Sequence, residues 1–77
     1  MTDTTLSDLR AALNTAFTDG EIEVALDGDR ARISVVSEAF AGLSRVKQQQ
    51  AVYAAIGQFV SDGRLHAVTI DTRTKDA

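Results

Sequence analysis

The segment Ser44–Thr72, SRVKQQQAVYAAIGQFVSDGRLHAVTIDT, contains the two elements that decide the fold, a long helix and the strand after it. Ser44 is a typical N-cap residue, and the apolar residues that follow it recur at helical spacing, which predicts a helix over residues 45–60. An Asp-Gly pair ends this helix, because glycine readily adopts the left-handed conformation found at helix ends. The following alternation of apolar and polar residues predicts a strand over residues 64–72.

The main apolar stripe of the long helix follows from the spacing of its large side chains. Residues three or four positions apart lie on one face of a helix, so they identify the surface that packs on the rest of the protein. The predicted stripe consists of Val46, Tyr53, Ile56 and Val60, and it is widened by Val52 and Phe59.

A first helix and two strands precede this segment. Apolar residues at helical spacing predict a helix over residues 5–17. Alternation predicts half-buried strands over residues 21–26 and about 31–37, and the Asp-Gly-Asp sequence between them is typical of a hairpin turn. The predicted order of helix, strand, strand, helix and strand indicates a two-layer α+β domain, with both helices on one face of a three-stranded mixed sheet.

The predicted topology brings together residues that are distant in the sequence. The long helix can form a right-handed crossover, after which the second and third strands pair in parallel. Parallel strands begin at the same end of a sheet, so we expect His66 to lie beside Arg32 and the turn at residues 27–30.

His66 is the only histidine of the chain and its best candidate for a functional residue. Imidazole titrates near neutral pH and binds metal ions when neutral, so one interpretation is a ligand or a proton-responsive group. The alternative is a half-buried structural histidine that bonds to the backbone. Strand alternation leaves the exposure of His66 open, because it places the residue on the same face as Val68 and Ile70.

Five of the eight basic residues are expected to gather around His66. They are Arg30, Arg32 and Arg64, together with Arg45 and Lys47 at the start of the long helix. A local basic patch on a chain of net charge −3 suggests a specific anionic partner surface, and an ordinary solvated face is the alternative.

Composition limits the remaining possibilities. A chain of 77 residues is expected to form one domain over residues 1–77, with a polar tail at about 73–77. It contains no cysteine, which excludes disulfides and thiolate metal sites made by this chain alone. The sequence pI of about 4.8 argues against non-specific nucleic-acid binding. Neither a signal peptide nor a membrane helix is evident, so we expect a cytoplasmic protein.

Catalytic motifs are not found. The serines lack an evident base and orienting group, and no glycine loop has the spacing of a phosphate-binding site. We therefore expect a protein that is not an enzyme.

Three motifs, in order along the chain, resemble those of the BolA family. Phe40-Ala41-Gly42 follows the second strand, Leu65-His66-Ala67-Val68 opens the third, and between them lie Ser44, Val46, Val52 and Tyr53. The Ser-Arg-Val-Lys-x-Gln-Gln-x-Val-Tyr pattern at Ser44–Tyr53 is most similar to the bacterial YrbA/IbaG-like branch. The resemblance implies an α-β-β-α-α-β fold, similar to a class II KH domain, with a short helix near residues 38–42.

The resemblance also implies a partner and a function. BolA-like proteins pair with monothiol glutaredoxins, either apo or with a shared [2Fe-2S] cluster, and they are linked to iron–sulfur trafficking and stress response. The glutaredoxin cysteine and glutathione supply thiolates, and the family histidine maps to His66. No cluster is expected on this chain alone, which by itself is expected to be a monomer or a weak homodimer.

One position departs from the family pattern. The second cluster ligand of the family maps to Arg30, which cannot ligate while charged. Asp27 and Asp29 beside it offer oxygen ligands, which suit a soft cluster poorly. The alternative function is a KH-like nucleic-acid-binding transcriptional regulator, although the chain lacks a G-x-x-G loop and its net charge disfavours DNA.

Overall fold

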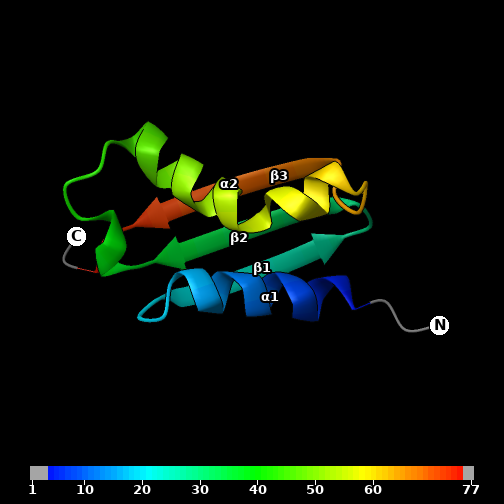
Figure 1. Ribbon diagram of the computed structural model, residues 1–77, viewed down its shortest axis with the longest axis horizontal. Helices are drawn as coiled ribbons and strands as arrows, with labels where there is room; N and C mark the ends of the chain where they lie inside the picture. Colours follow the sequence, from blue (N-terminus) through cyan, green and yellow to red (C-terminus); the bar gives the residue numbers. More distant parts are fainter. Residues whose placement is uncertain (1–3, 76–77) are drawn as a thin grey trace.

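The computed structural model describes residues 4–75. Its elements are α1 (Thr5–Ala16), β1 (Glu21–Asp27), β2 (Arg30–Val36), the 3-10 helix η1 (Glu38–Phe40), α2 (Arg45–Ser61) and β3 (Ala67–Arg73). The predicted α-β-β-α-α-β order is confirmed, with the short helix present as a single 3-10 turn (Figure 1). The last strand begins later than predicted, because Arg64, Leu65 and His66 form the connection from α2 to β3.

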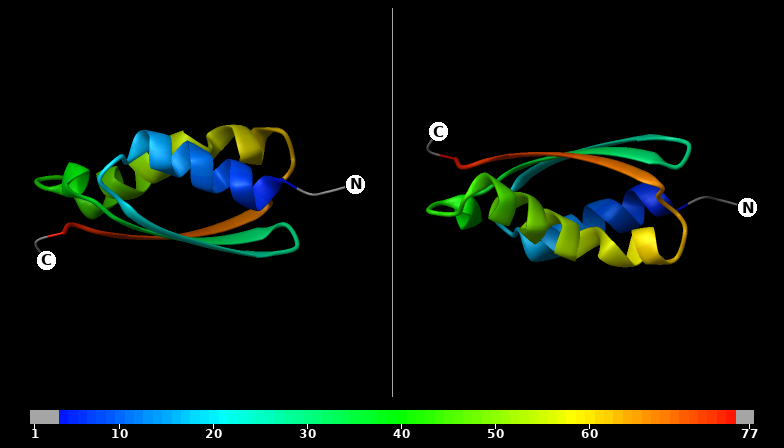
Figure 2. Two further views of the ribbon diagram at one scale, coloured as in Figure 1. Left: turned by 90° about the horizontal axis from the view of Figure 1, so that it is seen from below. Right: turned by 90° about the horizontal axis from the view of Figure 1, so that it is seen from above.

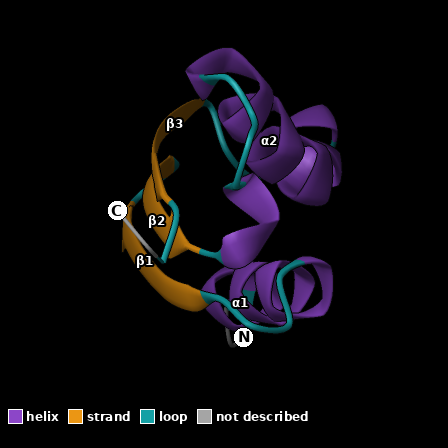
Figure 3. Ribbon diagram, turned by 90° about the vertical axis from the view of Figure 1, so that its left-hand side faces the viewer, coloured by secondary structure: helices purple, strands orange, loops and turns teal. Residues whose placement is uncertain are grey.

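The three strands form one mixed sheet in the order β1-β2-β3. β1 pairs antiparallel with β2, whereas β2 and β3 are parallel, as predicted. Both helices pack against the same face of the sheet, and the opposite face is open to solvent (Figures 2 and 3). No helix within residues 4–75 combines the length and apolar character needed to cross a membrane.

The hydrophobic core lies between the sheet and the two helices. Ile33 and Val35 of the central strand are fully buried, and Leu9 and Leu13 of α1 meet them from one side. Phe40 closes one end of the core and packs its ring 5.2 Å from that of Phe17. Alternation along β2 thus directs its apolar residues toward the helices, as expected for a half-buried sheet.

The predicted stripe of α2 is wrong in part. The buried residues of this helix are Val52, Ile56 and Phe59, whereas Val46 and Tyr53 are 65% and 46% exposed. Apolar residues extend around much of the helix, so the periodicity is compatible with more than one buried face. β3 is an outer strand of the sheet, and within residues 4–75 no further strand covers the flank of α2 that carries Val46 and Tyr53.

A carboxylate joins two loops at the end of the domain opposite the β1–β2 turn. Asp19 accepts hydrogen bonds from the hydroxyl of Ser37 at 2.7 Å and from the backbone N–H of Glu38 at 2.9 Å. The bond from the Glu38 N–H, supported by the bond from Ser37, lowers the pKa of Asp19 below its ordinary value of 3.8. The Asp19 carboxylate therefore connects the α1–β1 loop to the start of η1.

We expect Asp19→Asn to destabilise the protein at neutral pH. We also expect the stability of the variant to change less than that of the wild type as the pH falls into the acidic range. A lowered folded-state pKa contributes stability that is complete above pH 3.8 and is lost as the pH falls through the folded value. The difference in urea midpoint between the wild type and the variant should therefore be largest at pH 7 and shrink toward pH 2. A difference of the same size at both pH values would contradict the role of the charged carboxylate.

A candidate partner-binding site around His66

His66 lies at the surface, directly before β3. Its side chain is 69% exposed, while the preceding Leu65 is 1% exposed and belongs to the core. The backbone N–H of Leu65 donates to the carbonyl of Phe59 at 3.1 Å, which fixes the connection between α2 and β3. The anchored leucine therefore presents the next side chain to solvent, and a buried structural role for His66 is excluded.

The imidazole of His66 is held by the carboxylate of Asp29. Nδ1 of His66 lies 2.7 Å from Oδ2 of Asp29, and the backbone N–H of His66 donates to the Asp29 carbonyl at 2.9 Å. An ionised carboxylate only accepts hydrogen bonds, so the proton of this contact lies on Nδ1. The lone pair of the neutral ring is then on Nε2, which has no hydrogen-bond partner within residues 4–75.

The hairpin turn positions Asp29. Asp27 pairs with Arg30 across the two strands, so Gly28 and Asp29 form a two-residue loop. Gly28 has a φ of +61°, the conformation that the first central position of a type II′ turn requires. The predicted proximity of this turn to His66 is confirmed. Arg32, in contrast, pairs with Thr69 and lies farther along the sheet.

Sequence reasoning did not find the role of Asp29. It considered this carboxylate only as a poor cluster ligand, although the predicted parallel pairing already placed the turn next to His66. The available signal was therefore topological: a carboxylate in a tight turn next to the start of a parallel strand can reach the residue that precedes that strand. The contact joins residues 37 positions apart, which no local pattern reveals.

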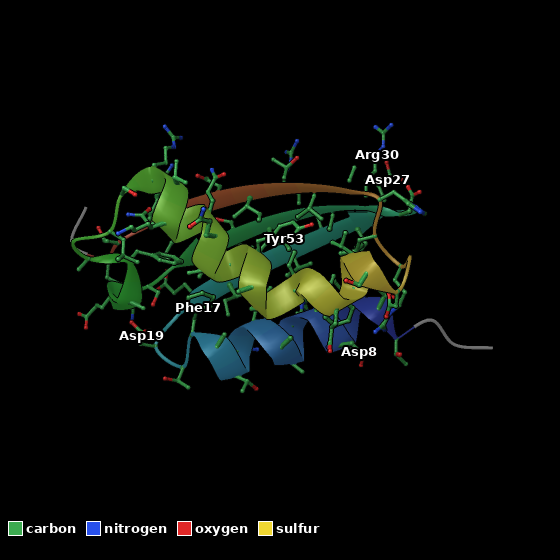
Figure 4. The ribbon with its side chains drawn as sticks, turned by 45° about the horizontal axis from the view of Figure 1, so that its top comes forward. Asp8, Phe17, Asp19, Asp27, Arg30 and Tyr53 are labelled. Atoms are coloured by element: carbon green, nitrogen blue, oxygen red, sulfur yellow. The ribbon has the colours of Figure 1, made fainter. Side chains whose placement is uncertain are left out.

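Arg30 lies on the open face of the sheet at the start of β2. It pairs in register with Ala67 of β3 and with Asp27 of β1 (Figure 4). Its guanidinium has no carboxylate within 4.0 Å in the described part of the chain. The same part of the chain contains no group of three or more His, Asp or Glu side chains arranged to hold a metal ion. The geometry therefore provides one imidazole ligand at this end of the sheet.

Arg64 is near His66 in the chain but its charge is already paired. It forms ion pairs with Asp8 at 3.1 Å and with Asp62 at 3.0 Å, and its guanidinium lies 4.4 Å above the centre of the Phe59 ring. Partial removal from water alone would lower the pKa of Arg64, but the bonds to Asp62 and Asp8 outweigh it and raise that pKa. Arg64 thus joins the end of α2 to α1.

The predicted basic patch of five residues is wrong as a single cluster. Arg45 and Lys47 lie at the start of α2, which is at the opposite end of the molecule from the start of β3 (Figure 1). A helix that connects two parallel strands runs back along the sheet, and 17 residues span about 25 Å. Arg30 and Arg32, which form no ion pair within residues 4–75, therefore remain on the strand that begins beside His66.

The fold and the site define a small two-layer α+β domain that presents a fixed and exposed imidazole at one end of its sheet. The family model described as "BolA-like protein" matches residues 13–77. The acid stress protein IbaG of Escherichia coli K12 is 37% identical over 68 residues, which cover 88% of this chain and 81% of IbaG. The chain belongs to the BolA-like family.

Solved structures agree with this assignment at the level of the fold. The BolA domain of SufE1 from Arabidopsis thaliana superposes with a TM-score of 0.87 at 25% identity, covering 99% of this chain and 98% of that chain. BolA1 from the same plant gives a TM-score of 0.82 at 24% identity, covering 99% and 96% of the two chains. The resemblance seen in the sequence is thus confirmed by the family match and by the fold.

Proposed function

We propose that this protein is a non-enzymatic adaptor that binds a monothiol glutaredoxin and contributes His66 as one ligand to a shared [2Fe-2S] cluster. The observation that carries the proposal is the exposed imidazole whose Nδ1 is held by Asp29, and whose Nε2 has no hydrogen-bond partner among the described residues. Membership of the BolA-like family supports the choice of partner.

The residues present fit a shared cluster and not a cluster on this chain alone. Metal-ligating histidines commonly donate their second ring N–H to a carboxylate, which fixes the tautomer and the ring orientation. The contact between His66 and Asp29 has this form. The chain has no cysteine, and Arg30 occupies the position of the second family ligand, so soft thiolate ligands have to come from the glutaredoxin and glutathione.

The biological setting that we propose is iron–sulfur trafficking or stress response in the cytoplasm. The name of the Escherichia coli relative, acid stress protein, supports the second of these roles. Recognition of DNA has less support, because the basic residues are divided between the two ends of the molecule.

The test is an anaerobic titration of the protein into cluster-loaded monothiol glutaredoxin in the presence of glutathione, followed by visible absorption and circular dichroism. We expect a new spectrum that saturates at equimolar protein. A parallel calorimetric titration with apo-glutaredoxin measures docking without a cluster. An unchanged spectrum with retained apo binding would limit the function to docking, and absence of both would refute the proposal.

We further expect Arg30 and Arg32 to orient the partner through its carboxylates. Exchange of both for glutamate should weaken apo-glutaredoxin binding about fivefold or more, mainly through a slower association rate. The matched control is Arg45→Glu with Lys47→Glu, which changes the net charge equally at the far end of the domain. Equal losses for the two double variants in stopped-flow measurements would show a general charge effect and contradict a local contact.

A further inference from the structure

β3 is an outer strand of the sheet, and its outer edge has no strand partner within residues 4–75. A groove of about 320 Å³ runs beside it, between β3 and α2. Val46 and Tyr53 of the helix and Val68 and Ile70 of the strand line the groove, and Tyr53 lies toward β3 (Figure 4). An open strand edge beside exposed apolar side chains is a surface on which another strand can add.

The hydrogen bonds of β3 identify which backbone groups face outward. The N–H of Ala67 and the carbonyl of Arg73 bond to the chain on the β2 side, to Asp29 and Ser37 respectively. Because backbone groups alternate along a strand, those of residues 68, 70 and 72 point to the outer edge. The amide of Gln49 confirms this direction, since it reaches the Ile70 carbonyl from outside at 3.4 Å.

We propose that the outer edge of β3 pairs antiparallel with β3 of a second copy of this chain. Outward groups must face outward groups, so the two-fold axis falls at one of residues 68–72. An axis at Val68 or at Thr69 places no charged residue opposite Asp71. An axis at Asp71 places two aspartates opposite each other, and an axis at Ile70 places Asp71 opposite Thr69. An axis at Thr72 places Asp71 of each copy opposite Arg73 of the other copy, which gives two attractive pairs. Charge complementarity therefore selects the register centred on Thr72.

The opposite edge of the sheet is less suited to the same contact. β1 carries Glu21, Glu23 and Asp27, all exposed on the open face, and a second copy of this strand would bring like charges together. At the β3 edge, pairing would join two sheets into one of six strands and bring the two α2 helices together, with Val46 and Tyr53 toward the seam. His66 lies at the other end of β3 and stays outside the paired segment, so the dimer does not depend on the proposed function.

Sedimentation equilibrium of the full chain, from about 10 µM to about 1 mM, tests the proposal. Pairing along one short strand edge buries little surface, so we expect weak and reversible association. Asp71→Arg and Arg73→Asp should each weaken the dimer about tenfold, since each turns two attractive cross-strand pairs into repulsive ones. The double variant D71R/R73D restores both attractions and should dimerise like the wild type. An equimolar mixture of the two single variants should form a heterodimer more readily than either variant dimerises alone.

Glu23→Arg is the matched control, because it reverses a charge on the open face at the other edge of the sheet. It should leave the association constant unchanged. Three results would overturn the proposal: a monomer over the whole concentration range, a dimer that is insensitive to Asp71→Arg, or no rescue by the double variant. Far-ultraviolet circular dichroism of each variant verifies that the fold is retained.

Discussion

Replacing His66 with alanine is expected to abolish the spectrum of a cluster shared with glutaredoxin and to leave the fold intact. The side chain is 69% exposed and its hydrogen bond with Asp29 lies at the surface, so the free energy of unfolding should change by less than about 1 kcal/mol. His66 is the only imidazole in the sequence, so its loss removes the ligand that we propose for the shared cluster. Visible circular dichroism during the anaerobic titration measures the loss.

Asp29→Ala should have a smaller effect on the cluster spectrum than His66→Ala. It removes the carboxylate that holds Nδ1 but keeps the imidazole and the backbone carbonyl that accepts from the His66 N–H. Loss of such a supporting contact typically weakens metal binding by about 10–100-fold, so the spectrum should appear at higher protein concentration and not vanish. A normal spectrum in the His66 variant would show that the imidazole is not a ligand, and unfolding of that variant would assign the histidine a structural role.

Phe40→Ala should have the largest effect on stability. The ring is fully buried and packs 5.2 Å from that of Phe17, and truncation of a buried phenylalanine typically costs about 3–5 kcal/mol. A domain of 77 residues has a free energy of unfolding of about 4–12 kcal/mol, so the substitution should remove a large part of it. Urea denaturation followed by circular dichroism should show a strongly reduced midpoint.

Val46→Ala is the control for this second prediction. The side chain is 65% exposed and lies in the first turns of α2, where alanine is a better helix former than valine. The urea midpoint of the Val46→Ala variant should stay close to that of the wild type at low protein concentration. Equal midpoints for Phe40→Ala and the wild type would contradict the placement of Phe40 in the core.

The order of the elements and their main boundaries could be predicted from the sequence, because they depend on interactions between close neighbours. The Ser44 hydroxyl caps α2 by accepting from the Lys47 N–H at 3.2 Å, as its residue type suggested. Gly28 and Gly63 adopt positive φ where Asp-Gly pairs predicted a turn and a helix end. The alternation of β2 identified its buried face. Each of these features depends on a few consecutive residues, so local patterns suffice.

The composition of the site was decided by the tertiary structure. His66 is exposed because Leu65 is drawn into the core beside it, and its partner Asp29 comes from a turn 37 residues earlier. Arg64 is paired because α1 brings Asp8 to it, and Arg45 and Lys47 are remote because α2 runs back along the sheet. Periodicity specifies which faces of an element are apolar, but contacts between elements depend on how those faces pack in three dimensions. The sequence by itself therefore determined the family, the order of elements and the single candidate ligand, and only the packing of helices on the sheet decided which charges stand beside it.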